Sequence, residues 1–226
     1  MARGLFITGT GTGVGKTYVA ALIARSLAAA GKRVGVYKPV ASGCELHDGR
    51  LVSPDAVTLW EAAGKPGTLD QACPQIFAAP IAPHVAARAE GRRVDPKLLR
   101  TGLDFWRESC DIVLVEGAGG LLSPLSDDDY NADLAAEFGY PLVIVAANEL
   151  GTINATLQTL IAARHHRHGL RVAGVILNSP RPLANDPSTA SNADELRKRC
   201  DVPLLAVMAH GGGLDCDVDW WALAGM

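Results

Sequence analysis

The clearest chemical signal in the chain is the glycine-rich stretch GTGTGVGKT, residues 9–17. Its glycines let consecutive backbone N–H groups turn toward an anion, and Lys16 and Thr17 then open an alanine-rich stretch typical of a helix. In such a loop the lysine reaches phosphate oxygens and the threonine hydroxyl binds Mg²⁺, whereas a simple strand-to-helix turn would need neither residue. The glycine of the standard spacing, six residues before Lys16, is here Thr10. The stretch therefore predicts a nucleotide site with an unusual loop.

Other polar side chains follow apolar, strand-like runs, namely Lys38, Glu116 and Asn178. In an open parallel sheet ligands bind at the carboxyl ends of the strands, so these positions favour function. Glu116 could hold Mg²⁺ directly or through water, and the glycines after it would let phosphate oxygens approach. Asn178 offers an amide donor and acceptor that match the edge of adenine, and Lys38 would place a charge at the same edge of the sheet. Each residue alone also fits a plainer interpretation, as a solvated lysine, a helix cap or a turn asparagine.

Short apolar runs alternate with helical stretches along the chain. The runs lack polar alternation, as strands covered on both faces do, and lie at residues 5–8, 33–37, 111–116, 141–147, 172–177 and 202–208. The expected helices span residues 16–30, 95–109, 131–138, 152–168 and 188–200. This order predicts an α/β fold with a doubly wound, mostly parallel sheet and helices on both faces. The glycine-rich loop after the first strand makes the expected fold one of the P-loop NTPase type.

Some segments break this alternation. Residues 41–94 are rich in Pro, Gly, His and Ala, and we expect an irregular insertion of loops with one short helix after Pro54. Residues 178–190 predict a mobile loop, and the DDD stretch at 127–129 predicts a solvated turn. We expect a single domain over residues 1–226, because a chain of this length with 48% hydrophobic residues suits one sizeable core.

Composition narrows the classes of partner. A formal net charge of −3 at pH 7 argues against binding nucleic acid or a membrane surface by bulk electrostatics. No stretch approaches the roughly 18 uninterrupted apolar residues of a membrane helix, and the start lacks the long apolar region of a secretory signal. The 5 cysteines are scattered, without a C-x-x-C pair, which fits reduced thiols. We therefore expect a cytoplasmic protein that acts on small ligands, with no nucleic-acid or membrane partner.

As a group, the stretches GTGTGVGKT, KPVASG (38–43), FAAPIAPH (77–84), VEGAGG (115–120) and ELGTINA (149–155) resemble the dethiobiotin synthetase family in order and spacing. The resemblance runs from about residue 4 to residue 207, and the longer glycine loop is similar to that family's own form. It implies a ligase that uses ATP to join 7,8-diaminononanoate and CO₂ into dethiobiotin, through a carbamate and a carbamic-phosphoric anhydride. Such a reaction asks the protein mainly for positioning and charge neutralisation. The resemblance also implies a homodimer with the active site near the subunit interface.

The resemblance assigns roles by position. Lys16 and Lys38 would neutralise the carbamate and the transferring phosphoryl group, and Mg²⁺ would be held by Thr17, Asp55 and Glu116. The nucleotide would contact Thr12, Gly13, Val14, Gly15, Lys16, Thr17, Tyr18, Asp55, Glu116, Gly117, Ala118, Gly119 and Asn178. The substrate would contact Ser42, Pro80, Leu150, Gly151 and Asn154. Of these, the helix start at Gly151 would present free N–H groups to the carboxylate of a diamine bound mainly by the other subunit.

Two alternatives share the expected fold. A partition- or septum-type ATPase would be a nucleotide-controlled switch on DNA or membrane, but such proteins use the shorter loop and carry a lysine where this chain has Thr10. A cobyrinate-type amidoligase domain normally accompanies a glutaminase domain, and this chain ends at residue 226. The chain also departs from the dethiobiotin synthetase pattern at Gly11, where an aspartate is frequent, and at Gly13, where an acid sometimes stands. AVMAH, residues 206–210, replaces a Gly-x-hydrophobic-Pro sequence, which leaves the nucleotide preference open.

Overall fold

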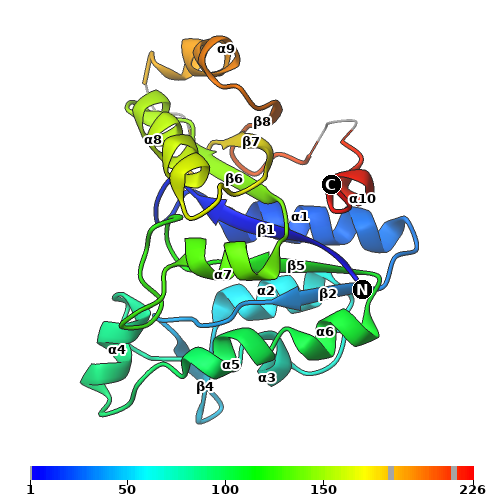
Figure 1. The fold of residues 1–226 in the computed structure, drawn as a ribbon, viewed down its shortest axis with the longest axis vertical. Coiled ribbons are helices and arrows are strands. Elements are labelled where there is room, and N and C mark those ends of the chain that lie inside the picture. The colour runs from blue at the N-terminus through cyan, green and yellow to red at the C-terminus, as the bar shows by residue number, and fades with distance from the viewer. Residues whose placement is uncertain (1, 183–185, 215–217) are drawn as a thin grey trace.

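The computed structural model describes residues 2–182, 186–214 and 218–226, and its centre is a 6-stranded sheet (Figure 1). The strand order is β2-β5-β1-β6-β7-β8, and every neighbouring pair is parallel. The strands are β1 (Arg3–Gly9), β2 (Val34–Tyr37), β5 (Ile112–Glu116), β6 (Leu142–Ala147), β7 (Val172–Asn178) and β8 (Leu204–Met208). The parallel sheet that the apolar runs predict is therefore confirmed.

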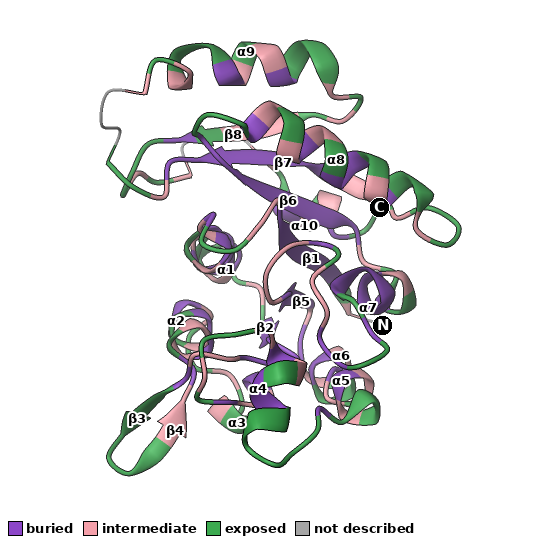
Figure 2. Cartoon of the chain, turned by 90° about the vertical axis from the view of Figure 1, so that its left-hand side faces the viewer, coloured by how far each residue is buried: buried purple, intermediate pink, exposed green. Residues whose placement is uncertain are grey.

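Helices cover both faces of this sheet (Figure 2). On one face lie α1 (Lys16–Ala29) and α2 (Pro54–Ala62), and on the other lie α6 (Asp104–Ser109) and α7 (Asn131–Phe138). The other helices are α3 (Leu69–Ala72), α4 (Pro83–Ala89), α5 (Pro96–Thr101), α8 (Thr152–His165), α9 (Thr189–Arg199) and α10 (Trp220–Leu223). Within the described part of the chain, no helix has the length and apolarity needed to span a membrane.

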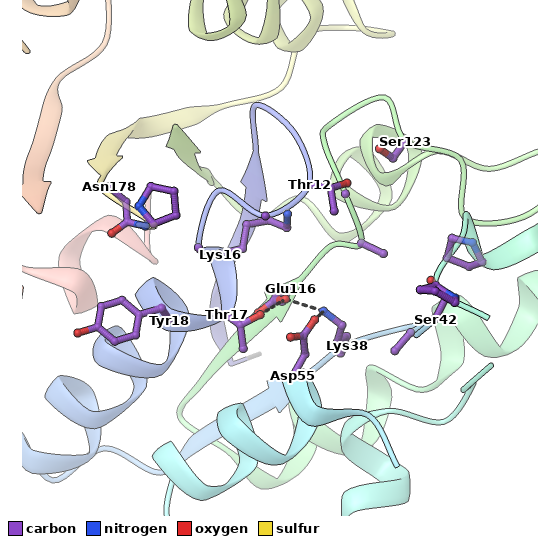
Figure 3. A pocket seen from close by; sticks show the side chains of 18 of the residues that line it. Thr12, Lys16, Thr17, Tyr18, Lys38, Ser42, Asp55, Glu116, Ser123 and Asn178 are labelled. Carbon is purple, nitrogen blue, oxygen red and sulfur yellow. Dashed lines mark hydrogen bonds and ion pairs between the residues drawn. The ribbon is translucent and has the colours of Figure 1, made fainter. Parts of the chain in front are cut away.

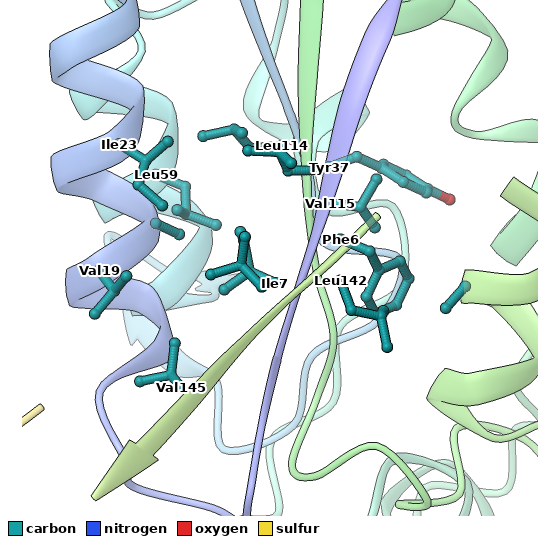
Figure 4. Packing of buried hydrophobic residues seen from close by; sticks show 14 of the residues in the cluster. Phe6, Ile7, Val19, Ile23, Tyr37, Leu59, Leu114, Val115, Leu142 and Val145 are labelled. Atoms are coloured by element: carbon teal, nitrogen blue, oxygen red, sulfur yellow. The ribbon is translucent and has the colours of Figure 1, made fainter. Parts of the chain in front are cut away.

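The hydrophobic core forms a layer on each side of the sheet (Figure 4). Successive strand residues point to opposite faces, so Ile7 packs toward Ile23 of α1 while Phe6 faces α7. Phe6 and Tyr37 lie with their ring centroids 6.4 and 6.5 Å from that of Phe138. Since both faces are covered, the strands must be apolar throughout, and each fully buried side chain of this size stabilises the fold by about 1.5–3 kcal/mol.

The strand order also positions the candidate site. From β1 the chain crosses to β2 at one edge and returns to β5 beside β1, whereas β6, β7 and β8 extend the sheet on the other side of β1. The direction of winding therefore reverses at β1. In open α/β sheets, ligands bind at the carboxyl ends of the strands beside such a reversal. The loops after β1 and β5 leave the sheet at this point.

The structure corrects several local predictions. The expected helix over 95–109 is divided into α5 and α6 at Gly102, where a β-carbon would lie 2.4 Å from the Tyr37 hydroxyl oxygen. The segment 41–94 holds more than one short helix, because it contains α2, α3 and α4 and also a hairpin, β3 (Glu45–His47) with β4 (Arg50–Val52). Asp48 and Gly49 form its two-residue turn with φ of 51° and 78°, as a type I′ turn requires.

Two other expectations concern exposed loops. The DDD turn is only partly solvated: Asp127 and Asp128 are exposed, but Asp129 is buried. Its carboxylate accepts hydrogen bonds from Arg100 Nη2 at 2.7 Å and from Ser126 Oγ at 2.6 Å. The mobile loop expected over 178–190 begins inside β7 and ends inside α9, and part of it, residues 183–185, lies outside the described residues. Its mobility stays a prediction.

Candidate active site

The phosphate-loop stretch connects β1 to α1 with its backbone N–H groups available. Gly13 and Gly15 adopt φ of 76° and 92°, a conformation that favours glycine, and Gly15 is the N-cap of α1. No described residue accepts a hydrogen bond from the backbone N–H groups of residues 11–17. Lys16 is buried, and its Nζ donates to the Gly11 carbonyl oxygen at 3.0 Å. A row of free amides with a lysine folded across it is the arrangement that binds phosphate.

This loop borders a cavity of about 790 Å³ at the carboxyl edge of the sheet. The structure brings most of the predicted site residues to its wall: Thr12, Gly13, Gly15, Lys16, Thr17, Tyr18, Lys38, Ser42, Asp55, Pro80, Glu116, Ala118, Gly119 and Asn178. Figure 3 shows Asn178 and Tyr18 at one end, Ser42 at the other, and the charged residues between them. Val14 and Gly117 belong to the same loops but do not line the cavity.

Lys38 is the centre of the charged cluster. Its Nζ lies 2.6 Å from Asp55 Oδ2 and 2.6 Å from Glu116 Oε1, and its backbone N–H is anchored to the Ala72 carbonyl oxygen at 2.7 Å. Lys38 is 3% exposed and Glu116 is 1% exposed. Burial alone would lower the pKa of Lys38, but Glu116 and Asp55 outweigh it and raise that pKa above its ordinary value. The lysine is therefore fully charged at neutral pH.

Two more groups of the cluster, Lys16 and Asp55, also have shifted pKa values. Burial lowers the pKa of Lys16, and Glu116 opposes that effect only in part. Burial would raise the pKa of Asp55, but attraction to Lys38 outweighs it and holds that pKa below its ordinary value. Asp55 is placed by the start of α2, where Ser53 caps the helix by accepting from Ala56 N and a proline occupies the first turn. The sequence SPDA, residues 53–56, thus places the Asp55 carboxylate at the start of α2, beside the cluster.

The donor set of this cluster fits a divalent cation. Thr17 Oγ1 donates to Glu116 Oε1 at 2.9 Å, which leaves the threonine lone pairs free. Glu116 Oε2 is buried and has no hydrogen-bond partner among the described residues. A buried carboxylate oxygen without a partner is costly unless a cation or donor satisfies it. Two carboxylates and a hydroxyl beside a phosphate loop are the hard oxygen ligands that Mg²⁺ combines with nucleotide phosphates.

Asn178 supports the phosphate loop as well as lining the cavity. Its Nδ2 donates to the Val14 carbonyl oxygen at 2.9 Å, and a β-carbon on Gly15 would lie 2.2 Å from that nitrogen. Within the described residues, Asn178 Oδ1 accepts no hydrogen bond. Tyr18, next to it in the wall, donates from its hydroxyl to the Gly212 carbonyl oxygen at 2.9 Å. The loop after β8 is therefore tied to α1 at this end of the cavity.

Some wall residues were not singled out from the sequence: Ala41, Ser123, Pro124, Ser179, Pro180, His210 and Gly211. Ala41 precedes Ser42, and Ser179 and Pro180 follow Asn178, so adjacency to a predicted site residue was the available signal for these three. Ser42 is brought to the wall by local pairing, because Gly43 N donates to the Ala79 carbonyl oxygen at 3.0 Å. That bond also places Ser42 beside Pro80.

The structure does not bring the start of α8 to the cavity. Leu150 is 83% exposed, and Gly151 and Asn154 are also exposed. None of these residues lines the cavity of the chain that carries them. No described residue accepts from the backbone N–H groups of Ile153 and Asn154, so this helix start presents free donors at the surface.

The sheet order, the glycine loop and the carboxylate that ends β5 define a P-loop nucleotide-binding fold. Solved structures agree at the level of the fold. The septum site-determining protein MinD of Pyrococcus horikoshii, in complex with Mg-ADP, matches with a TM-score of 0.54 and 21% identity over 92% of this chain and 82% of that one. A ParA family ATPase from Chlorobium tepidum matches with a TM-score of 0.56 and 16% identity over 92% of this chain and 84% of that one.

Sequence relatives place the chain more narrowly. A family model described as an AAA domain matches residues 3–213. The ATP-dependent dethiobiotin synthetase of Rhodopirellula baltica is 45% identical over 94% of this chain and 86% of its own length. The enzyme of the same name from Aromatoleum aromaticum is 39% identical over 94% of this chain and 93% of its own length. The one from Anaeromyxobacter dehalogenans is 44% identical over 91% of this chain and 89% of its own length. The chain belongs to the dethiobiotin synthetase family, as its motifs predict.

Proposed function

We propose that this protein is an ATP-dependent dethiobiotin synthetase, a ligase that closes a cyclic urea on 7,8-diaminononanoate with CO₂. The observation that carries the proposal is the convergence of Lys16, Lys38 and Glu116 on one cavity of about 790 Å³, in a chain that belongs to this family. One substrate amine would add to CO₂ and lose a proton, which gives a carbamate. A carbamate oxygen would then take the γ-phosphoryl group as ADP leaves. The second amine would attack the carbamate carbon, and phosphate would leave as the ring closes.

The main task of the protein in this sequence is to hold negative charge. The carbamate and the transferring phosphoryl group are both anionic, and Lys38 offers an ammonium that is 3% exposed, so water screens its charge only weakly. Lys16 would move from the Gly11 carbonyl oxygen, 3.0 Å away, to the phosphate oxygens. The amides of residues 11–17 would hold the remaining phosphate oxygens. Positioning and charge neutralisation by these groups supply what phosphoryl transfer requires.

We propose that Thr17, Asp55 and Glu116 hold Mg²⁺ together with the nucleotide phosphates. One support is Glu116 Oε2, which is buried and has no hydrogen-bond partner in the described part of the chain. The other is the Thr17 hydroxyl, which donates to the other oxygen of the same carboxylate at 2.9 Å. The bound ion would neutralise charge on the β and γ phosphoryl oxygens. Lys38 already contacts Glu116 Oε1, so the two oxygens of this carboxylate would serve the lysine and the metal separately.

We propose that the adenine lies at the Asn178 end of the cavity. With Nδ2 committed to the Val14 carbonyl oxygen, Asn178 has its Oδ1 left to accept from the exocyclic amine of adenine. Guanine carries a carbonyl oxygen at that position and would repel the same atom. This geometry supports a preference for ATP over GTP, which the atypical residues 206–210 leave open from the sequence alone.

The diamine would occupy the Ser42 and Pro80 end, and we propose a homodimer that completes this end. Leu150, just before α8, and Ile161 within it are 83% and 56% exposed, which suits an apolar contact with a second copy. Across that contact Leu150, Gly151 and Asn154 would meet the carboxylate of the substrate bound mainly by the other copy. The free N–H groups at this helix start suit a carboxylate. The expected location in the cytoplasm and the single domain over residues 1–226 stay predictions.

The direct test is ADP release by the purified protein with diaminononanoate, bicarbonate and MgATP. We expect release only when all three are present, together with formation of dethiobiotin detected by mass spectrometry. Hydrolysis that ignores the diamine but responds to DNA or lipid vesicles would refute the ligase and favour the switch ATPase. Repeating the assay with the four common nucleoside triphosphates tests the base preference. Turnover with GTP equal to that with ATP would contradict the role given to Asn178.

A further inference from the structure

One buried asparagine on α7 holds the loop that follows β5. Asn131 is 0% exposed, and its Oδ1 accepts from Ala118 N at 3.1 Å. Its Nδ2 donates to the Ala118 and Gly120 carbonyl oxygens, each at 2.7 Å, and more weakly to the Ser123 carbonyl oxygen at 3.4 Å. The Asn131 backbone N–H also donates to the Ser123 carbonyl oxygen at 3.2 Å. Among the described residues, all polar partners of this side chain therefore belong to the loop 117–123.

The side-chain contacts of Asn131 are not part of the cap of α7. The N-terminus of α7 is capped by Asp133, whose Oδ2 accepts from Tyr130 N at 2.8 Å. Asn131 instead faces the loop so closely that a β-carbon on Gly117 would lie 2.4 Å from its Oδ1. Gly117 thus has no side chain because the asparagine occupies the space. A buried amide with every group paired fixes a backbone segment more strictly than apolar packing does.

The loop that Asn131 holds forms part of the cavity wall. Gly119 lines the cavity with φ of 76°, and no described residue accepts from its backbone N–H. Ser123 also lines the cavity, and its Oγ accepts from Gly120 N at 2.8 Å, which leaves its own proton free to be donated. A β-carbon on Gly120 would lie 3.3 Å from the Gly9 carbonyl oxygen, so this loop rests against the phosphate loop. Both free donors thus lie beside the proposed phosphate site.

We propose that Asn131 is a positioning residue that aims the Gly119 N–H and the Ser123 hydroxyl at the γ-phosphoryl group and the carbamate. The proposal rests on the proposed ligase function for the identity of the second anion. Asn131 itself lies outside the cavity wall and acts through the loop. Donors fixed before the reaction stabilise developing charge without reorganisation, and a displacement of about 1 Å can cost a factor of about 100 in rate.

The test compares Asn131→Ala and Asn131→Asp with a matched control, Gln75→Ala. Gln75 is 5% exposed, and its amide likewise pairs with the N–H and carbonyl of one residue, Asp95, at 2.7 and 3.1 Å, but it does not line the cavity. We expect both alanine variants to lose thermal stability to a similar extent. Only Asn131→Ala should lose kcat, by about 100-fold, with little change in the affinity for MgADP. Asn131→Asp keeps the acceptor for Ala118 N but sets a second oxygen against the Ala118 and Gly120 carbonyl oxygens, so it should lose at least as much stability and kcat as Asn131→Ala.

A second readout separates this inference from the proposed function. The ratio of affinities for a non-hydrolysable ATP analogue and for ADP, measured by calorimetry, reports contacts to the γ-phosphoryl group without turnover. We expect this ratio to fall about 10-fold in the Asn131 variants and to be unchanged in Gln75→Ala, which corresponds to the loss of an ordinary charge-assisted hydrogen bond. If the wild-type protein shows no diamine-dependent turnover, the ligase function fails, and the ratio alone judges the role of Asn131. An unchanged ratio, or an equal loss of kcat in Gln75→Ala, would overturn the inference.

Discussion

Replacing Lys38 by methionine should separate its structural role from its chemical one. Methionine keeps the length of the side chain but removes the ammonium that lies 2.6 Å from both Asp55 and Glu116. Glu116, at 1% exposure, would then be a buried carboxylate without its cation, whereas the side chain of Asp55 is 50% exposed and can be hydrated. Breaking a buried pair in this way costs about 3–5 kcal/mol. For a chain of this size we expect Tm to fall by about 6–20 °C.

The double variant Lys38→Met, Glu116→Gln should recover most of that stability. Glutamine is neutral, so no buried charge is left unpaired, and its oxygen can still accept from Thr17 Oγ1. Turnover should not recover, because the positive charge beside the carbamate is still missing and a proposed Mg²⁺ ligand has been neutralised. Removal of one such stabilising group lowers kcat by about 10²–10³-fold. Stability and turnover should therefore respond differently to the second substitution.

Differential scanning fluorimetry and ADP release with diamine, bicarbonate and MgATP measure the two effects. Lys198→Met serves as the control, because the Lys198 side chain is 68% exposed and its partner Glu195 lies on the same helix. The single variant Lys38→Met should still bind MgADP with affinity close to that of the wild type. An unchanged Tm in Lys38→Met would show that the lysine does not compensate Glu116. Loss of nucleotide binding, or recovery of turnover in the double variant, would refute the role given to Lys38.

Three further changes test the loop, the metal and an ion pair. Gly15→Ala should abolish nucleotide binding, because Gly15 has a φ of 92° and its new β-carbon would lie 2.2 Å from Asn178 Nδ2. The control Gly91→Ala, at a φ of 67° with no atom within 4 Å of the new β-carbon, should still bind nucleotide. Calorimetry with MgADP measures both affinities. Thr17→Val should remove most of the Mg²⁺ dependence of nucleotide binding. If EDTA does not change the Tm of the wild-type protein with bound nucleotide, the proposed metal site is contradicted. Asp129→Asn should cost about 1–3 kcal/mol at pH 7. Burial would raise the pKa of Asp129, but the hydrogen bond from Arg100 outweighs it and lowers that pKa in the folded protein. The carboxylate therefore stabilises the fold fully above its unfolded-state pKa, and this stabilisation is lost as the pH falls through its folded-state pKa. Urea unfolding should show the deficit of the variant shrinking below about pH 4, and a deficit independent of pH would contradict this.

The parallel sheet and the glycine loop could be predicted because their signals are local. Strands buried on both faces require continuous apolar runs, and the residues at their carboxyl ends meet at one edge whatever the details of packing. For that reason Lys38, Glu116 and Asn178, read only as strand exits, do line one cavity. Asp55 came from the family resemblance, and its place at the start of α2 agrees with the cap formed by Ser53.

The segments that could not be predicted depend on contacts distant in sequence or on weak burial. The hairpin of β3 and β4 is largely exposed and carries no apolar alternation, although the turn residues Asp48 and Gly49 were a signal that the sequence contained. The break at Gly102 arises from the Tyr37 hydroxyl, which donates to the carbonyls of the preceding turn. Asn131 lies inside a stretch predicted correctly as a helix, but its partners are in another loop. No local pattern marks such a residue.

The unusual phosphate loop changes the charge of the site more than its shape. A β-carbon on Gly11 would meet nothing within 4 Å, so an acidic side chain would fit there without moving the loop. Its absence leaves Lys16 bonded to a neutral carbonyl oxygen at 3.0 Å, while Glu116 is shared with Lys38 and Thr17. Burial lowers the pKa of Lys16, so its ammonium is costly until an anion arrives. Phosphate oxygens would relieve that cost and raise the pKa again. In this chain the nucleotide, rather than a carboxylate in the loop, would complete the charge balance of the site.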